Sequence, residues 1–210
     1  MADVLVKLCG CNTPESIDAA VDSGADYIGL NLYEPSPRHV SVEDAVKLRQ
    51  RVPEHVRIAL VTVDMDPVAL ARAAEAIRPD VIQFHGGETV QWLSMVKQSG
   101  ITVWKAIGVR ERASLDRTLR FDGAVHRVLY DAAPGVLPGG NGLALDWSLV
   151  AGYPHRIPWG LAGGLTPENV GDAIRATGAV MVDTASGIES APGVKDAGRI
   201  RAFVEAARAA

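Results

Sequence analysis

The sequence is poor in cysteine and has no long apolar run. Cys9 and Cys11 are the two cysteines among 210 residues, and within a strand they would share one face with poor disulfide geometry. No further Cys or His cluster accompanies this C-x-C pair, so we expect no metal site. The apolar runs are too short to span a bilayer, and residues 1–10 lack the basic and long apolar regions of a signal peptide. These absences predict a protein of the reducing cytoplasm without membrane partners.

The chain also lacks a strong excess of charge. Lys and Arg number 21 against 25 Asp and Glu, so the net charge of −4 carries no electrostatic footprint of nucleic-acid binding. Hydrophobic residues make up 48% and charged residues 22%, which is typical of globular proteins. No linker, low-complexity segment or charge block divides the sequence. We therefore expect one domain covering residues 1–210.

Short apolar segments alternate with amphipathic or Ala-rich segments along the whole chain. Because each apolar segment is apolar throughout, the pattern indicates a parallel sheet buried on both faces. Eight such units fit a compact (β/α)8 TIM barrel, whereas a doubly wound open sheet rarely needs eight. The strand candidates are residues 4–9, 25–32, 56–63, 81–85, 102–109, 124–131, 156–163 and 179–185, and the helix candidates are 14–23, 42–51, 67–77, 89–99, 112–119, 147–151, 167–177 and 197–209.

Three helices carry a clear start signal. Thr13-Pro14, Asp66-Pro67 and Thr166-Pro167 each place a capping side chain before a proline at the first helical position. Asp66 could equally be only a turn-forming residue. The segment 134–145 between the sixth and seventh strand candidates is rich in Gly and Pro, which is typical of a loop.

The barrel architecture predicts where a site would lie. Active sites in this fold are built at the carboxyl ends of the strands. The polar residues and glycines expected there are Cys9, Arg38, Asp64, Gln83, His85, Asp131, Gly163, Gly164, Ser186 and Gly187.

Cys9 and Asp131 are the candidates for acid–base chemistry. They end the first and sixth strand candidates, which face each other across the mouth of a closed barrel. A carboxylic acid and a thiolate on opposite sides of a substrate can donate and accept a proton. From position alone, a buried small hydrophobic Cys9 and a loop or capping Asp131 explain these residues equally well. Lys7 lies two residues before Cys9, so it can also face inward and act as an electrostatic helper.

Gly163-Gly164 and Ser186-Gly187 stand at the ends of the seventh and eighth strand candidates. In LAGGLTPENV (161–170) and DTASGIES (183–190), glycines let backbone N–H groups approach an anion, and a helix terminus adds a favourable dipole. Phosphate sites after these two strands recur in the fold. Gly163, Gly164, Ser186 and Gly187 are therefore candidates for phosphate binding, with ordinary turn glycines as the alternative.

Arg38, Gln83 and His85 are candidates for substrate binding. Pro37 stiffens the loop that presents Arg38, whose fork suits a carboxylate or a phosphate, although a single arginine is more often a solvated surface residue. Gln83 and His85 share one face of a strand, so both should point into the barrel. For His85, a satisfied core histidine is the alternative, and the role of Asp64 stays open.

Seven segments together resemble the phosphoribosylanthranilate isomerase family of tryptophan biosynthesis, over essentially the whole chain and in the right order. The resemblance implies a (β/α)8 barrel without metal or organic cofactor. It also implies an aldose–ketose isomerase for a small phosphosugar, acting as a monomer or homodimer. The segments are VKLCG (6–10), GADYIGLNLYEPSPRHVS (24–41), IQFHGGE (82–88), LYDA (129–132), LPGGNGLALDW (137–147), LAGGLTPENV (161–170) and VDTASGIESAPGVKD (182–196).

By the family's pattern, Cys9 is the general base, Asp131 is the general acid and Arg38 binds the anthranilate moiety. The phosphate is held by the loops of Gly163-Gly164 and Ser186-Gly187, and Asp183 helps to orient the sugar. The reaction implied is the Amadori rearrangement of N-(5-phosphoribosyl)anthranilate to 1-(2-carboxyphenylamino)-1-deoxyribulose 5-phosphate.

The chain departs from the family's pattern at several positions near these segments. Cys11-Asn12 replaces the usual Ile-Thr, Asn31 stands in the second strand, and Tyr130 precedes the acid. These departures bear on the shape of the pocket more than on the reaction. The rival interpretations are another phosphosugar isomerase or lyase on the same barrel, and a non-catalytic barrel.

Overall fold

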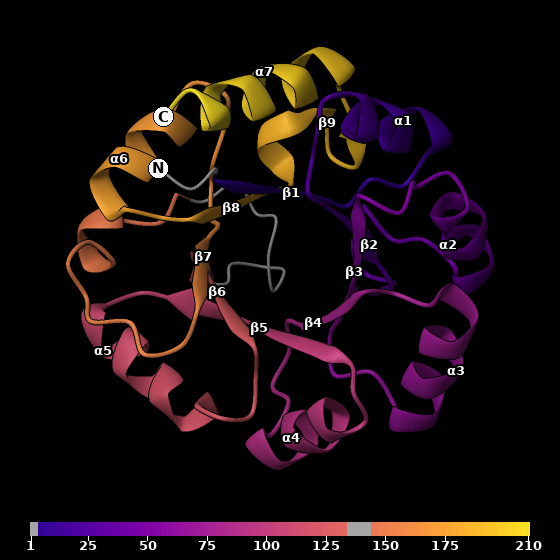
Figure 1. Cartoon of the computed structure of the whole chain (residues 1–210), viewed down its shortest axis with the longest axis horizontal. Helices are drawn as coiled ribbons and strands as arrows, with labels where there is room; N and C mark the ends of the chain where they lie inside the picture. Colours follow the sequence, from indigo (N-terminus) through magenta and orange to yellow (C-terminus); the bar gives the residue numbers. More distant parts are fainter. Residues whose placement is uncertain (1–3, 134–143) are drawn as a thin grey trace.

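Eight parallel strands close into a barrel in a computed structural model that describes residues 4–133 and 144–210. Figure 1 shows the helices as a ring around these strands. The first strand pairs with the eighth, and every other pairing joins neighbours in sequence. The predicted (β/α)8 barrel is therefore confirmed. Among the described residues, no helix is long and apolar enough to cross a membrane.

The strands and helices alternate as the sequence predicts. The barrel strands are β1 (Leu5–Cys9), β2 (Tyr27–Asn31), β3 (Arg57–Thr62), β4 (Val81–Phe84), β5 (Thr102–Val109), β6 (Arg127–Ala132), β7 (Trp159–Leu161) and β8 (Met181–Thr184). The α-helices are α1 (Pro14–Asp22), α2 (Val42–Arg49), α3 (Pro67–Ile77), α4 (Val90–Gln98), α5 (Arg112–Asp116), α6 (Val170–Thr177) and α7 (Ala197–Arg208).

Two of the three predicted helix starts are confirmed. The Thr13 side chain accepts a hydrogen bond from the Ser16 N–H at the start of α1, and Asp66 caps α3 in the same way. The predicted start at Pro167 is wrong, because α6 begins at Val170. The Asn169 side chain accepts a hydrogen bond from the Thr166 N–H and donates one to the Gly164 carbonyl. These bonds hold residues 164–169 as a turn.

Other elements differ from the sequence prediction. Residues 147–151 form only a 3-10 turn, Trp147–Leu149, and α5 continues as a second 3-10 turn, Arg117–Phe121. After β8 comes a 3-10 turn, Ser186–Ile188, followed by a short hairpin of β9 (Glu189–Ala191) and β10 (Val194–Lys195) that the sequence did not predict. The predicted loop 134–145 lies outside the described residues except for its last two positions, and so does most of the segment 137–147.

The side chains inside the barrel change character from one end to the other. Toward the amino ends of the strands, a buried cluster fills the interior with Tyr27, Ala59, Val81, Trp104, Ala106, Leu129 and Met181, and Leu5 packs on it. Because side chains alternate along a strand, Lys7 and Cys9 lie on the same inner face as Leu5. The interior above the apolar cluster is therefore polar, at the end where the sequence predicts the site.

Candidate active site

Asp131 is held at the barrel mouth by two neighbours. Its side chain is 14% exposed, and its Oδ1 accepts a hydrogen bond of 2.8 Å from the Ala132 N–H. Its Oδ2 lies 3.4 Å from Nε2 of His85, the residue that directly follows β4. The structure thus brings together two predicted site residues from different strands, and His85 contacts Asp131 as well as facing the mouth.

Cys9 ends β1 beside a buried cation. Lys7, two residues earlier, is fully buried, and its Nζ donates a hydrogen bond of 2.9 Å to Oδ1 of Asp183. Lys7 and Asp183 are direct partners in the pairing of β1 with β8, which explains how residues 176 apart in sequence meet. Burial alone would lower the pKa of Lys7, but Asp183 and Cys9 raise it above its ordinary value, so the ammonium stays protonated.

A glycine makes room for the thiol and the ammonium together. Gly29 is the partner of Cys9 in the pairing of β1 with β2. A Cβ atom at Gly29 would lie 2.9 Å from the Cys9 Sγ and 3.3 Å from the Lys7 Nζ. Both groups therefore border the same small space. Burial raises the pKa of the Cys9 thiol, while the charges of Lys7 and Lys195 act in the opposite direction and favour the thiolate.

Asp183 links the two halves of the site. It is 7% exposed on the inner face of β8, where it binds Lys7. The charges of Asp131 and His85 also act on it, so it lies within electrostatic range of both the thiol side and the carboxyl side of the mouth. The sequence predicts Asp183 as a site residue, and the structure adds Lys7 as its partner.

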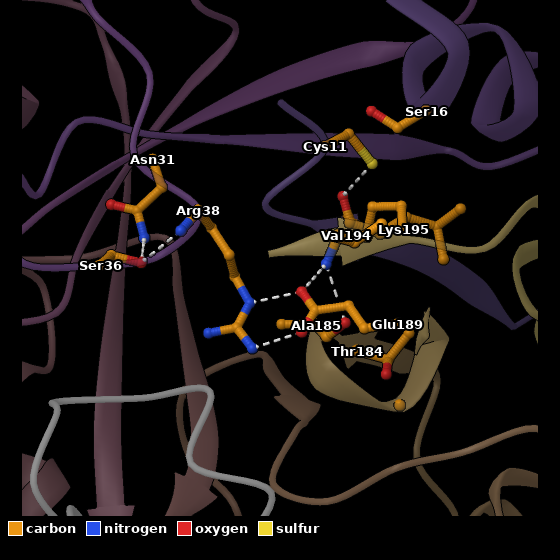
Figure 2. Close-up of polar contacts among 12 residues, drawn as sticks. Cys11, Ser16, Asn31, Ser36, Arg38, Thr184, Ala185, Glu189, Val194 and Lys195 are labelled. Carbon is orange, nitrogen blue, oxygen red and sulfur yellow. Dashed lines mark hydrogen bonds and ion pairs between the residues drawn. The ribbon is translucent and has the colours of Figure 1, made fainter. Parts of the chain in front are cut away.

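Arg38 lies in a buried ion pair, which excludes the alternative of a solvated surface arginine. It is 5% exposed, and its Nε and Nη2 each donate a 2.7 Å hydrogen bond to the carboxylate of Glu189 in β9. Figure 2 shows this fork together with Lys195, whose Nζ donates 2.8 Å hydrogen bonds to Glu189 Oε1 and to the Ala185 carbonyl. Burial alone would raise the pKa of Glu189, but Arg38 and Lys195 hold it below its ordinary value.

The loop that presents Arg38 is organised by Asn31, one of the departures from the family's pattern. The Asn31 Nδ2 donates to the Ser36 hydroxyl, and the same hydroxyl accepts from the Arg38 N–H (Figure 2). The Asn31 Oδ1 accepts from the Tyr33 N–H. Asn31 therefore shapes the loop around Arg38, a role that its position in the second strand did not reveal.

Gly163-Gly164 and Ser186-Gly187 lie on neighbouring loops. Gly163 and Gly164 both have positive φ, and a Cβ at Gly163 would lie 2.5 Å from the backbone nitrogen of Ala132. The Thr184 hydroxyl donates a 2.7 Å hydrogen bond to the Leu165 carbonyl, which ties the loop after β8 to the loop after β7. Ser186 and Gly187 open the 3-10 turn that follows. The geometry can present backbone N–H groups to an anion, and the phosphate role of these four residues stays a prediction.

The remaining candidates have different surroundings. Gln83 is 1% exposed inside the barrel, and its buried side-chain oxygen has no hydrogen-bond partner in the part of the chain that the structure describes. Asp64 is exposed and accepts a hydrogen bond from the Gly87 N–H, which makes it a loop residue. Cys11 is fully buried in the core, where burial raises its pKa to about 11, so it packs as a small apolar side chain.

Sequence reasoning missed Glu189 and Lys195. Both stand in residues 182–196, one of the segments that carry the family resemblance, and nothing local in the sequence indicates that they fold back onto Arg38. The interactions of the mouth are thus a thiol beside an ammonium, a carboxyl beside an imidazole, and an arginine beside a carboxylate. Over residues 4–133 and 144–210, no three His, Cys, Asp or Glu side chains gather in a possible metal site.

Comparisons with known proteins agree on one family. A family model described as N-(5'-phosphoribosyl)anthranilate (PRA) isomerase matches residues 6–206. The N-(5'-phosphoribosyl)anthranilate isomerase of Erythrobacter litoralis is 55% identical to the chain, covering 97% of it and 98% of the relative. A crystal structure of phosphoribosyl anthranilate isomerase from Thermotoga maritima superposes with a TM-score of 0.91 at 33% identity, covering 99% of this chain and 100% of that one. A phosphoribosyl anthranilate isomerase solved with reduced 1-(o-carboxyphenylamino)-1-deoxyribulose 5-phosphate has a TM-score of 0.88 at 32% identity, with 99% and 100% coverage.

Proposed function

The chain belongs to the N-(5'-phosphoribosyl)anthranilate isomerase family, and from that premise we propose that it converts N-(5-phosphoribosyl)anthranilate to 1-(2-carboxyphenylamino)-1-deoxyribulose 5-phosphate. The observation that carries the proposal is the barrel mouth itself. There Lys7 binds Asp183 and borders the same space as Cys9, and the charges of Asp131 and His85 also act on Asp183. An acid and a base at the same mouth of the barrel are what an aldose–ketose rearrangement requires.

Asp131 is the general acid of the proposed mechanism. Its proton goes to the ring oxygen of the ribose, the bond between that oxygen and C1 breaks, and the anilino nitrogen forms the Schiff base. The Ala132 N–H orients one carboxyl oxygen, and the other faces His85. This arrangement supports the assignment because it fixes the direction of the carboxyl group before the substrate binds.

Cys9 is the general base. The thiolate takes the proton from C2 of the sugar, and the electrons of that C–H bond form the enolamine and neutralise the Schiff-base nitrogen. The enolamine then tautomerises to the ketose. Each proton transfer is worth on the order of 10²–10⁴-fold in rate. Lys7 assists because its ammonium stabilises the thiolate that burial would otherwise disfavour.

The phosphate and the anthranilate carboxylate of the substrate would bind to two different groups of loops at the barrel mouth. The loops of Gly163-Gly164 and Ser186-Gly187 would hold the phosphate, and the Arg38 loop would receive the anthranilate carboxylate. Asp183, Gln83 and His85 lie on the inner faces between them and would contact the sugar. The chemistry proposed needs one acid and one base, so activity should persist after treatment with a chelator.

A fluorescence assay tests the proposal. Phosphoribosylanthranilate is generated in situ from anthranilate and phosphoribosyl pyrophosphate, and its fluorescence is followed after addition of the purified protein. We expect enzyme-dependent loss of the signal with formation of the carboxyphenylamino ketose. Absence of turnover would reject the proposal in favour of another phosphosugar reaction or a non-catalytic barrel. Turnover that disappears with a chelator would reject its cofactor-free form.

A further inference from the structure

The ion pair around Arg38 uses one edge of the guanidinium. The two hydrogen bonds to Glu189 are parallel, each 2.7 Å long, and they engage Nε and Nη2. The two side chains are only 6% and 4% exposed, so the pair is shielded from water. Its bonds to the described residues therefore leave the third nitrogen, Nη1, to meet a ligand. In Figure 2 that nitrogen points away from Glu189.

The charges of this cluster do not balance. Glu189 also binds Lys195, whose side chain is 1% exposed, so one carboxylate faces two buried cations. Burying an unbalanced charge destabilises the folded state, and apolar side chains would stabilise a purely structural contact at least as well. The excess positive charge favours negative groups nearby: Lys195 favours the Cys9 thiolate, and a carboxylate bound at Arg38 would be favoured in the same way.

The surrounding backbone restrains the arginine. A Cβ at Gly10, where φ is +75°, would lie 2.7 Å from the Arg38 Cδ, so the loop after β1 packs against the arginine stem. A Cβ at Gly193 would collide with the Pro37 carbonyl, which places the β9–β10 hairpin directly on the loop that presents Arg38. Three loops thus meet around one guanidinium, and Glu189 supplies the hydrogen bonds that set its orientation.

We propose that Glu189 is a positioning residue: it holds Arg38 through Nε and Nη2 so that Nη1 binds the carboxylate of the substrate, and Lys195 fixes Glu189 in turn. This inference rests on the proposed function. It predicts that Glu189 acts on affinity for the carboxylate through Arg38, and that it has little part in the proton transfers.

Two ligands isolate the carboxylate. One is reduced 1-(o-carboxyphenylamino)-1-deoxyribulose 5-phosphate, and the other is the same compound without the ring carboxylate. Their dissociation constants are measured by calorimetry, and their ratio reports recognition of the carboxylate alone. We expect Glu189→Gln to weaken binding of the carboxylated ligand by about tenfold, the usual effect of losing a charge-assisted hydrogen bond. Binding of the second ligand should change less than about twofold, and kcat less than about threefold.

A double-mutant cycle separates positioning from a general structural effect. Arg38→Ala should remove the preference for the carboxylated ligand, and Glu189→Gln should have no further effect in that background. Additive effects in the cycle, or an unchanged ratio in Glu189→Gln, would overturn the inference. Glu88→Gln is the matched control, because Glu88 is also buried and paired with a lysine, Lys105 at 3.2 Å, but makes no contact with Arg38. It should leave the ratio of dissociation constants unchanged.

A second variant covers the case in which Glu189→Gln does not fold. Arg38→Lys keeps the charge but cannot bind Glu189 through two parallel bonds and a substrate through a third. It should lose the preference for the carboxylated ligand, and a normal preference would overturn the inference. If the unaltered protein neither turns over phosphoribosylanthranilate nor prefers the carboxylated ligand, the proposed function has failed. If it does both and the variants behave normally, only the role of Glu189 has failed.

Discussion

The two ends of the barrel interior accommodate positive charge in different ways. At the mouth, a buried cation faces a buried carboxylate: Lys7 binds Asp183 at 2.9 Å. At the opposite end, guanidinium groups cover aromatic rings. Arg57 lies over the ring of Tyr27 with its Cζ 5.6 Å from the ring centroid, and Arg127 lies over Trp104 at the same distance.

This difference reflects what each end does. A guanidinium over an aromatic ring needs no buried counter-ion and can remain partly in water, which limits the cost of desolvation: Arg57 is exposed and Arg127 is half-buried. In a buried ion pair both charges lose their contact with water, and this desolvation can offset the attraction between them, so such a pair is weak evidence for stability. In (β/α)8 barrels, stability is associated with the amino-terminal end of the strands and catalysis with the carboxyl end. The charges inside this barrel follow that division.

The largest effect should come from the carboxyl group at the mouth. Asp131→Asn keeps an oxygen for the Ala132 N–H but cannot donate the acidic proton, so we expect kcat to fall by at least about 10²-fold. Steady-state kinetics of the fluorescence assay measure this loss. Urea unfolding should show a folded protein, and a variant with normal kcat would exclude Asp131 as the acid.

Removal of the thiol should have an effect of similar size. Cys9→Ser replaces the base with a hydroxyl that is not ionised at neutral pH, and kcat should fall by at least about 10²-fold. Cys11→Ser is the matched control, because Cys11 is fully buried two residues away from Cys9. The kcat of this variant should be close to that of the parent protein. Normal turnover in Cys9→Ser would remove this cysteine from the mechanism.

Loss of the buried cation should change the ionisation of Cys9. The thiolate is the charged form and Lys7 stabilises it, so Lys7→Met should raise the pKa of the Cys9 thiol further. Below that pKa, alkylation by iodoacetamide should slow by on the order of tenfold in a Cys11→Ala background. The rising limb of the pH–kcat profile should move to higher pH. Lys7→Arg should restore much of the alkylation rate, and equal rates in Lys7→Met and the parent would contradict the role of Lys7.

The smallest effect on catalysis should come from the other end of the barrel. Arg127→Met removes the cation over Trp104 and the 2.8 Å hydrogen bond to the Trp159 carbonyl. We expect the free energy of unfolding in urea to fall by about 1 kcal/mol while kcat changes less than about twofold. A large loss of kcat without loss of stability would show that the two ends are not separated as the comparison suggests.

The predicted elements that came out right are those with strong local signals. Strand and helix order follows from apolar periodicity, and the starts of α1 and α3 follow from a capping side chain before a proline. The same signal at Thr166-Pro167 failed because Asn169 bonds to Thr166 and Gly164 and holds a turn there. The β9–β10 hairpin was missed because its strands are only three and two residues long.

The residues of the candidate site also differ in how far the sequence alone predicts them. Cys9, His85 and Asp131 could be placed at strand ends from the sequence, since one barrel architecture orders all eight strands, whereas Asp183 was indicated only by the family resemblance. Arg38 was predicted as a substrate-binding residue from the sequence. Its partner Glu189 was not predicted, because it is 151 positions away and no local pattern links the two residues. Lys7 could only be suggested as a helper, since its pairing with Asp183 depends on which residue of β8 lies beside it.

The sequence by itself determined the order of the elements, the inward and outward faces of the strands, and the family, because periodicity and motifs are local properties of the chain. Only the tertiary structure decided which charges meet. Closure of β1 on β8 sets the register that joins Lys7 to Asp183, and the fold of the segment after β8 brings Glu189 and Lys195 to Arg38. Such pairings depend on distances between residues far apart in the chain, and those distances exist only once the barrel has closed.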